Sequence, residues 1–353
     1  MAVGANAVAS ARRRSMSDAR PSEPCSLCGG RERRVVVTAY DRMQARAADY
    51  HYARCAGCGL LALVPLPSAS EIPGLYPSDY HDRIASWERN LDKPVNRLAI
   101  RYFYGVDSVD TPGWVRACFR AGSRRILRGI CEPRGENRLL DIGCGNGATL
   151  SVYRRLGWRT RGIDVSPQAA AACRRRGLTV HQGTVFDAPF GAEFDLVLLS
   201  HVIEHVREPI AMLQRAAGFL APGGAMVVST PNARGIGFAL YRSCWFALDA
   251  PRHLFLFDPR TIRLASDQAG LRVRRIVTRS TPETLRESRR YAATQGQVLP
   301  ADLARRTAIV ERSWRQTHRF RTYRDLMTPL TLLTALAGRG DVMDVELGAA
   351  AQA

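Results

Sequence analysis

The chain has little lysine and little histidine for its charge. Among its 353 residues Lys93 is the only lysine and there are seven histidines, yet the formal net charge is +19. Nearly all of this charge is therefore arginine, spread from Arg12 to Arg339 without an obvious cluster. A nucleic-acid surface needs basic residues gathered on one face, so the sequence does not favour a nucleic-acid partner.

Long apolar runs are absent as well. No stretch offers the roughly 20 consecutive apolar residues that span a bilayer, and the uncharged segment 216–233 contains Pro-Gly-Gly and Pro-Asn turn signals. Arginines 12–14 follow the weakly apolar residues 1–10, which is the reverse of a signal peptide. We expect a cytoplasmic protein with a disordered leader over residues 1–22; its oligomeric state is left open.

The nine cysteines do not suggest a disulfide framework, because their number is odd and four of them form two Cys-x-x-Cys pairs. The pairs are Cys25/Cys28 and Cys55/Cys58, and each runs into glycine. Four thiolates at this spacing fill a tetrahedral shell, which predicts one structural zinc in a ribbon-like module over residues 23–80. Redox use of the pairs is the alternative. Residues 81–136 are expected to form a helical linker region.

From residue 137 to 353 the pattern alternates strand and helix, as in a doubly wound α/β fold. The expected strands are 138–141, 160–164, 178–182, 194–200, 225–230, 271–278 and 341–347. The expected helices are 148–156, 167–176, 209–220 and 259–269, with a turn at 222–224 and a helical insertion over 281–338.

A glycine-rich turn joins the first of these strands to its helix. It reads Asp141-Ile142-Gly143-Cys144-Gly145-Asn146-Gly147. Glycines permit close approach of a ligand to the backbone, and the following helix offers free N–H groups. Asp141 is placed to pair with a cationic group, and Asp164, 23 residues later, with ribose hydroxyls.

Residues after the next two strands complete the predicted cofactor site. Asp187 is placed to accept from an adenine amino group, with Phe186 or Val165 against the ring. An NAD site is a rival interpretation, but it needs Gly-x-Gly-x-x-Gly, whereas this loop reads Gly-x-Gly-x-Gly.

These motifs resemble the class I methyltransferases that depend on S-adenosylmethionine (SAM). The likeness extends to Gly162-Ile163-Asp164, to the Phe194–Val206 segment and to Leu220–Gly224, and covers about residues 135–280. It implies SAM as cofactor, His201 beside it, and a Rossmann-like seven-stranded sheet with an antiparallel last strand. An amino-terminal zinc ribbon ahead of such a domain looks like bacterial methyltransferases of sugars, surface polysaccharides or natural products.

Three residues are candidates for acid–base chemistry at the acceptor: Glu204, His205 and His253. Of Glu204 and His205, one is expected to face the acceptor and the other to cap the following helix. His253 follows an aromatic segment within a predicted lid, 232–258, and Arg252 beside it is expected to steady an anionic group. The aromatic segment also leaves peripheral membrane contact open.

The sequence therefore predicts an enzyme that methylates a small-molecule or glycan acceptor, in cell-surface polysaccharide or secondary-metabolite biosynthesis. The alternative is a binding or regulatory protein that keeps the SAM fold without catalysis. The acceptor, and whether oxygen, nitrogen or carbon is methylated, do not follow from the residues.

Overall fold

The computed structural model describes residues 23–41, 49–76, 135–280, 282–293, 329–331 and 333–349. The predicted leader 1–22, most of the predicted linker region and residues 294–328 of the predicted insertion lie outside these ranges. Within the described part, no helix is long and apolar enough to cross a membrane.

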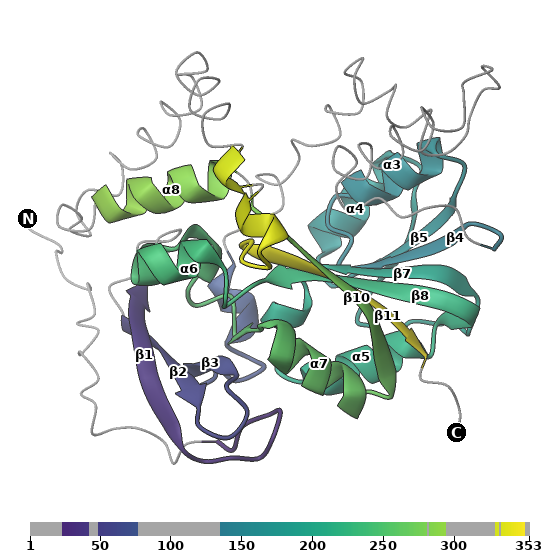
Figure 1. Ribbon diagram of the computed structural model, residues 1–353. Helices are drawn as coiled ribbons and strands as arrows, with labels where there is room; N and C mark the ends of the chain where they lie inside the picture. Colours follow the sequence, from purple (N-terminus) through teal and green to yellow (C-terminus); the bar gives the residue numbers. More distant parts are fainter. Residues whose placement is uncertain are drawn as a thin grey trace, which may run out of the picture.

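A seven-stranded sheet forms the centre of the molecule, in the order β10-β11-β8-β7-β4-β5-β6 (Figure 1). Its strands are β4 (Arg138–Ile142), β5 (Arg159–Asp164), β6 (Thr179–Gln182), β7 (Phe194–Ser200), β8 (Leu220–Pro231), β10 (Leu271–Arg279) and β11 (Val342–Ala349). The neighbours from β6 to β8 run parallel, whereas β11 pairs antiparallel with both β8 and β10. The predicted Rossmann-like sheet with an antiparallel last strand is confirmed.

Helices cover both faces of this sheet. Helices α3 (Ala148–Arg155) and α4 (Pro167–Arg175) lie on one face, and α5 (Pro209–Ala217) and α7 (Pro259–Gln268) on the other (Figure 1). Side chains alternate along each strand, so Leu139 joins the cluster under α3 and α4, whereas Leu140 joins the one under α5 and α7. Burial on both faces explains why the central strands are almost wholly apolar.

One predicted boundary is wrong. The helix expected to reach Leu220 ends at Ala217, and β8 begins at Leu220 rather than after the expected turn at 222–224. Phe194 of β7 pairs with Leu220 and Leu196 with Ala225, so the strand bulges across Pro222. A bulge tolerates proline because the ladder is already interrupted there.

The cysteine-containing segment forms a second sheet with a strand from much later in the chain. Strands β1 (Arg33–Tyr40), β2 (Asp49–Cys55) and β3 (Leu61–Val64) are antiparallel, and β9 (Phe255–Leu256) pairs with β3. Strand β9 lies within the predicted lid. Apolar residues of this sheet and of the α5 side of the large sheet belong to one buried cluster.

Several shorter elements complete the described part of the chain. They are η2 (Ile72–Leu75), η5 (Ile203–His205), α6 (Ile236–Tyr241), η6 (Arg242–Cys244), η7 (Phe246–Leu248) and α8 (Pro282–Ala293), and residues 329–336 are also helical where described.

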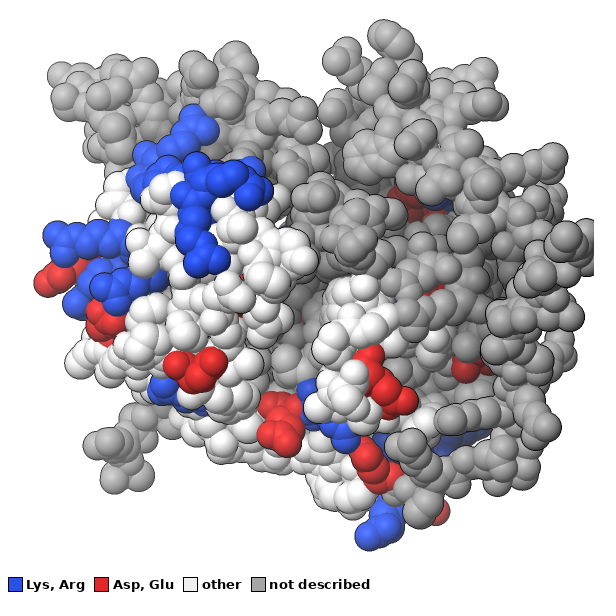
Figure 2. All heavy atoms as spheres, turned by 180° about the vertical axis from the view of Figure 1, so that it is seen from behind, with Lys and Arg blue, Asp and Glu red and all other residues white. Residues whose placement is uncertain are grey.

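Arginines gather on the side of the molecule where α3 and α4 lie (Figure 2). Arg154 and Arg155 occupy the last turn of α3, and Arg174 and Arg175 that of α4. Cations at helix C-termini are favoured by the helix dipole. Arg154 also donates to the carbonyls of Arg176 and Gly177, which joins the ends of the two helices.

Candidate functional site

The glycine loop after β4 adopts backbone angles that only glycine takes readily. Gly143, Gly145 and Gly147 have φ values of 71°, 54° and 79°. A Cβ on Gly143 would lie 2.5 Å from a Val202 methyl, and one on Gly147 only 2.4 Å from Leu178. At Gly145 nothing lies within 4 Å. The two outer glycines are thus needed for packing, whereas the middle one leaves open space over the loop.

Two buried carboxyl groups lie at the ends of the adjacent strands β4 and β5. Asp164 accepts hydrogen bonds from the backbone N–H groups of Gly145 and Ser166, both at 2.8 Å. Burial, together with the negative charges of the Asp164 carboxylate and the Cys173 thiolate nearby, raises the pKa of Asp141 to about 8. A carboxyl group in that state would gain strongly from a cationic ligand.

Apolar side chains stand exposed beside these carboxyl groups. Val165 is 68% and Phe186 55% exposed. Asp187 is exposed too, and it accepts from the backbone N–H and the hydroxyl of Thr184 at 2.6 and 2.8 Å. The Thr184 hydroxyl is the main reason why the pKa of Asp187 is lowered. These side chains follow β5 and β6, so they share an edge of the sheet with Asp141 and Asp164.

The segment after β7 carries a fully buried, ionised Glu204. Its Oε1 lies 3.0 Å from Nδ1 of His201, and its Oε2 accepts from the Thr230 hydroxyl at 2.9 Å. Burial alone would raise the pKa of Glu204, but the hydrogen bond from His201 and the charges of the surrounding histidines lower it to about 2. His201 has φ of 56°, and its side chain is 44% exposed. The next residue, Val202, packs against Gly143 of the glycine loop, so the exposed His201 ring lies near this loop.

His205 and His253 lie side by side, with ring centroids 4.6 Å apart. Nδ1 of His205 is 3.0 Å from the Arg252 carbonyl oxygen, and Nδ1 of His253 is 2.9 Å from that of Ala247. A carbonyl oxygen only accepts, so each Nδ1 carries a proton and Nε2 of the neutral ring is free of one. Burial and the charge of His253 lower the pKa of His205 to about 4.

The predicted acid–base residues converge. One ligand atom from each of Glu204, His205 and His253 lies within 4.8 Å of the others, and Nε2 of His253 is 4.0 Å from Oε1 of Glu204. The expectation that Glu204 or His205 caps the next helix is wrong, because the N-cap of α5 is Glu208 and no side chain caps it.

The prediction that Arg252 binds an anionic group of a ligand is wrong. Its side chain is 1% exposed, and its guanidinium donates to both carboxylate oxygens of Asp41 and to Asp249. Burial works against the charge, but the two carboxylates raise the pKa of Arg252 above its usual value. All three nitrogens of this guanidinium donate to acceptors within the protein.

Two tyrosines of the amino-terminal segment reach the histidines, and sequence reasoning missed both. The Tyr52 hydroxyl donates to the His253 carbonyl at 2.8 Å, and the Tyr76 hydroxyl lies 2.9 Å from Nδ1 of His205. The partners are 201 and 129 residues apart in the chain. No local pattern announces a contact of that kind.

The four paired cysteines come together as predicted. Sγ of Cys25 is 3.6 Å from that of Cys58, Sγ of Cys28 is 3.5 Å from that of Cys55, and all four lie within 4.8 Å of one another. Sulfurs on a tetrahedral zinc at about 2.3 Å would be separated by roughly 3.8 Å, so this donor set fits that ion.

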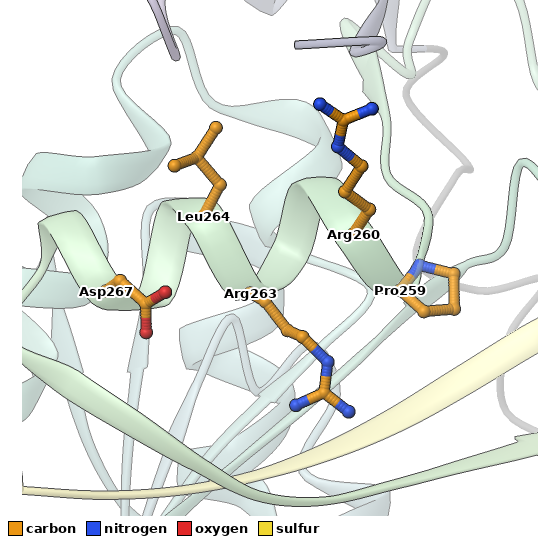
Figure 3. Close-up of a pocket in the computed structure, with 5 residues that line it drawn as sticks. All are labelled: Pro259, Arg260, Arg263, Leu264 and Asp267. Atoms are coloured by element: carbon orange, nitrogen blue, oxygen red, sulfur yellow. The ribbon is translucent and has the colours of Figure 1, made fainter.

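A hollow on the outer face of α7 is a poor rival for these sites. Pro259, Arg260, Arg263, Leu264 and Asp267 line it. The guanidinium groups of Arg260 and Arg263 point to opposite sides of the helix (Figure 3). The described lining therefore offers no convergent set of polar groups.

Residues 115–276 match a family described as a methyltransferase domain. A ubiquinone biosynthesis O-methyltransferase of Bradyrhizobium sp. (strain ORS 278) is 39% identical over 109 residues, which are 29% of this chain and 43% of that relative. A protein of the same name from Bradyrhizobium diazoefficiens is 38% identical over 135 residues, 36% of this chain and 53% of the relative. The chain thus spans about half or less of these relatives.

Among solved structures, the 1,6-didemethyltoxoflavin-N1-methyltransferase of Burkholderia thailandensis aligns with a TM-score of 0.40 and 17% identity. The alignment covers 68% of this chain and 91% of that one.

The glycine loop gives a first prediction. Gly147→Ala should lower the free energy of unfolding by about 2–4 kcal/mol, because it combines a left-handed backbone with a side-chain clash. Gly157→Ala is the matched control, since Gly157 has φ of 86° but open space around its Cβ position, and should cost only about 1–2 kcal/mol. Urea unfolding measures both; equal losses would show that packing at Gly147 does not matter.

Proposed function

We propose that the chain binds SAM at the carboxyl edge of the large sheet and methylates a hydroxyl group of a small molecule, since its residues 115–276 match a family described as a methyltransferase domain. The observation that carries the proposal is the buried Asp141 beside the open glycine loop. Its pKa of about 8 marks a carboxyl group that lacks a cation, and SAM carries an ammonium group.

The remaining residues fit the other parts of SAM. The positive end of the α3 dipole, at the start of the helix near Ala148, suits the carboxylate of the cofactor. Asp164 is the candidate for the ribose hydroxyls and Asp187 for the adenine amino group. Val165 and Phe186 would pack on the adenine ring, and His201 would lie near the sulfonium end. When bound, SAM supplies an electrophilic methyl group.

His253 is the best-placed general base. Its Nδ1 proton is fixed on the Ala247 carbonyl, so Nε2 is left to take a proton from an acceptor hydroxyl. The carboxylate of Glu204, 4.0 Å away, would stabilise the resulting imidazolium. His205 is a weaker base near neutral pH because its pKa is about 4, and it would instead border the acceptor as a neutral ring.

A hydroxyl acceptor is favoured because the two Bradyrhizobium relatives are named O-methyltransferases. Phenolic compounds and sugars, free or within a glycan, both present such hydroxyls, and these acceptors fit ubiquinone-like, polysaccharide or secondary-metabolite biosynthesis. A non-catalytic SAM-binding protein is the second candidate, and radiolabelled methyl transfer from SAM to phenols and nucleotide-linked sugars separates the two. SAM binding without transfer to any compound would favour the non-catalytic candidate.

SAM binding should release a proton. Near pH 7 most of the free protein carries a protonated Asp141, and a bound ammonium group favours its ionised form. Titration calorimetry in phosphate and in Tris should show close to one proton released, with affinity rising up to tenfold per pH unit as pH increases from 6 towards 8. Asp141→Asn should bind more weakly and release none. Binding by the native protein without proton release would contradict this role.

The four-cysteine cluster should hold one structural zinc, which a segment with so few strands needs for stability. Elemental analysis should find about one zinc per chain. Cys55→Ser should lower this content, whereas Cys244→Ser, a buried cysteine outside the cluster, should retain it. Native protein that is folded, reduced and free of zinc when prepared without chelator would refute the assignment.

Loss of the proposed base should affect turnover rather than cofactor binding. With any hydroxyl compound that the native protein methylates, His253→Ala should lower kcat by about 10²–10⁴-fold and leave SAM affinity nearly unchanged. His51→Ala, in β2 and hydrogen-bonded to Thr38, is the control and should keep its activity. A His253→Ala variant with native kcat and a raised KM would show that this residue only packs against the acceptor.

A further inference from the structure

A buried ion cluster joins the amino-terminal sheet to the segment that carries His253. Asp41 follows β1 directly and is fully buried, and its two carboxylate oxygens accept from Nη1 and Nη2 of Arg252 at 3.2 and 3.0 Å. Asp249 accepts from Nε and Nη2 of the same guanidinium at 2.9 and 2.7 Å. Nη1 also donates to the Leu75 carbonyl at 3.2 Å.

The backbone of Arg252 is part of the histidine pair's surroundings. Its carbonyl oxygen lies 3.0 Å from Nδ1 of His205. The backbone N–H groups of Arg252 and His253 both donate to the Asp249 carbonyl, at 2.9 and 3.2 Å. The turn 249–253 therefore contains Arg252 and Asp249 of the ion cluster and also His253. The Arg252 carbonyl of the same turn contacts the second histidine, His205.

Asp41 is the carboxylate partner of Arg252 that comes from outside this turn. Asp249 and Arg252 are three residues apart, whereas Asp41 is 211 residues away and arrives with the strands of the cysteine-containing segment. A buried guanidinium keeps its position only while carboxylates and carbonyls satisfy its donors, and leaving a buried charge short of a partner is strongly unfavourable. Without the Asp41 carboxylate, Nη1 and Nη2 of Arg252 would each lose one of their acceptors, the guanidinium would lose one of its two carboxylate partners, and the turn would have to adjust.

We propose that Asp41 is a positioning residue for the acceptor site: by fixing Arg252, it sets the orientation and the ring-proton position of His205 and the place of His253. Through Asp41, the cysteine-containing segment thereby helps to position the residues of the proposed acceptor site. The inference rests on the proposed function in so far as the two histidines border the acceptor, but the ion cluster and its effect on the rings do not require SAM or an acceptor.

The test is NMR of the histidine rings in the full chain labelled with ¹⁵N-histidine, with His205 assigned by the spectrum of a His205→Gln variant. In the native protein His205 should appear as a single Nδ1–H tautomer that titrates near pH 4. In Asp41→Asn its ring should show mixed tautomers, because the Arg252 carbonyl is no longer fixed, and should titrate at least one pH unit higher, because lost burial raises the pKa of His205 more than the lost hydrogen bond to that carbonyl lowers it. Zinc content and SAM affinity should stay within twofold of native.

Asp344→Asn is the matched control. It breaks a similar ion pair, Arg279 to Asp344 at 2.7 Å between β10 and β11, away from the histidines. It should leave the His205 signals unchanged. Unmoved ring signals in a folded Asp41→Asn variant, or equal changes in both variants, would overturn the proposal.

A second substitution covers the case in which Asp41→Asn does not fold. Asp41→Glu keeps the negative charge but adds a methylene, so it should fold and still shift the His205 tautomer and titration. Native signals in that variant would also overturn the proposal. Failure of the native protein to bind SAM would remove the proposed function instead, and would leave the result on the rings intact.

Discussion

The parallel strands end at one edge of the sheet, and this arrangement buries carboxyl groups close together. Asp141 and Asp164 occur at the ends of β4 and β5, and Glu204 follows β7. The fold stabilises each in a different way. Asp164 accepts hydrogen bonds from two backbone N–H groups. Glu204 accepts a hydrogen bond from the Thr230 hydroxyl and lies beside histidine rings. Asp141 takes up a proton because burial raises its pKa to about 8. The group left without a cation is the one beside the open glycine loop.

The same principle extends to the second sheet, where the buried charge is positive. Arg252 is held between Asp41 and Asp249, and its main chain contacts His205. Strand β9, next to this residue, completes the small sheet by pairing with β3. The cysteine-containing segment and the domain of the large sheet therefore share an apolar core, a sheet and an ion cluster, and the candidate acceptor site lies where they meet.

Much of this could be predicted from local sequence. Apolar runs such as Phe194–Ser200 predicted the central strands, the glycine spacing predicted the loop after β4, and the Cys-x-x-Cys pairs predicted their own convergence. The strands and the glycine loop depend on residues within a few positions of one another. The convergence of the cysteines follows from the preference of a zinc ion for four thiolate ligands. The predicted boundary between helix and strand near Leu220 was wrong because proline and glycine occur in β-bulges as well as in turns.

Contacts between distant segments could not be predicted in the same way. Arg252 has the chemistry of an anion-binding residue, and only the arrival of Asp41 from 211 residues away shows that its charge is already satisfied. Tyr52 and Tyr76 are unremarkable in sequence, and their roles come from the pairing of β3 with β9 and the packing around it. Such contacts follow from how two segments pack, which no spacing within either segment encodes.

In the proposed complex, the carboxyl edge of the large sheet holds SAM with its sulfur directed at the group formed by Glu204, His205 and His253. A crystal structure of the full chain with S-adenosylhomocysteine tests it most directly. We expect the amino group of the ligand on Asp141, its ribose on Asp164 and its sulfur facing the histidine pair. A ligand bound elsewhere, or one whose sulfur faces away from these residues, would contradict the proposed site.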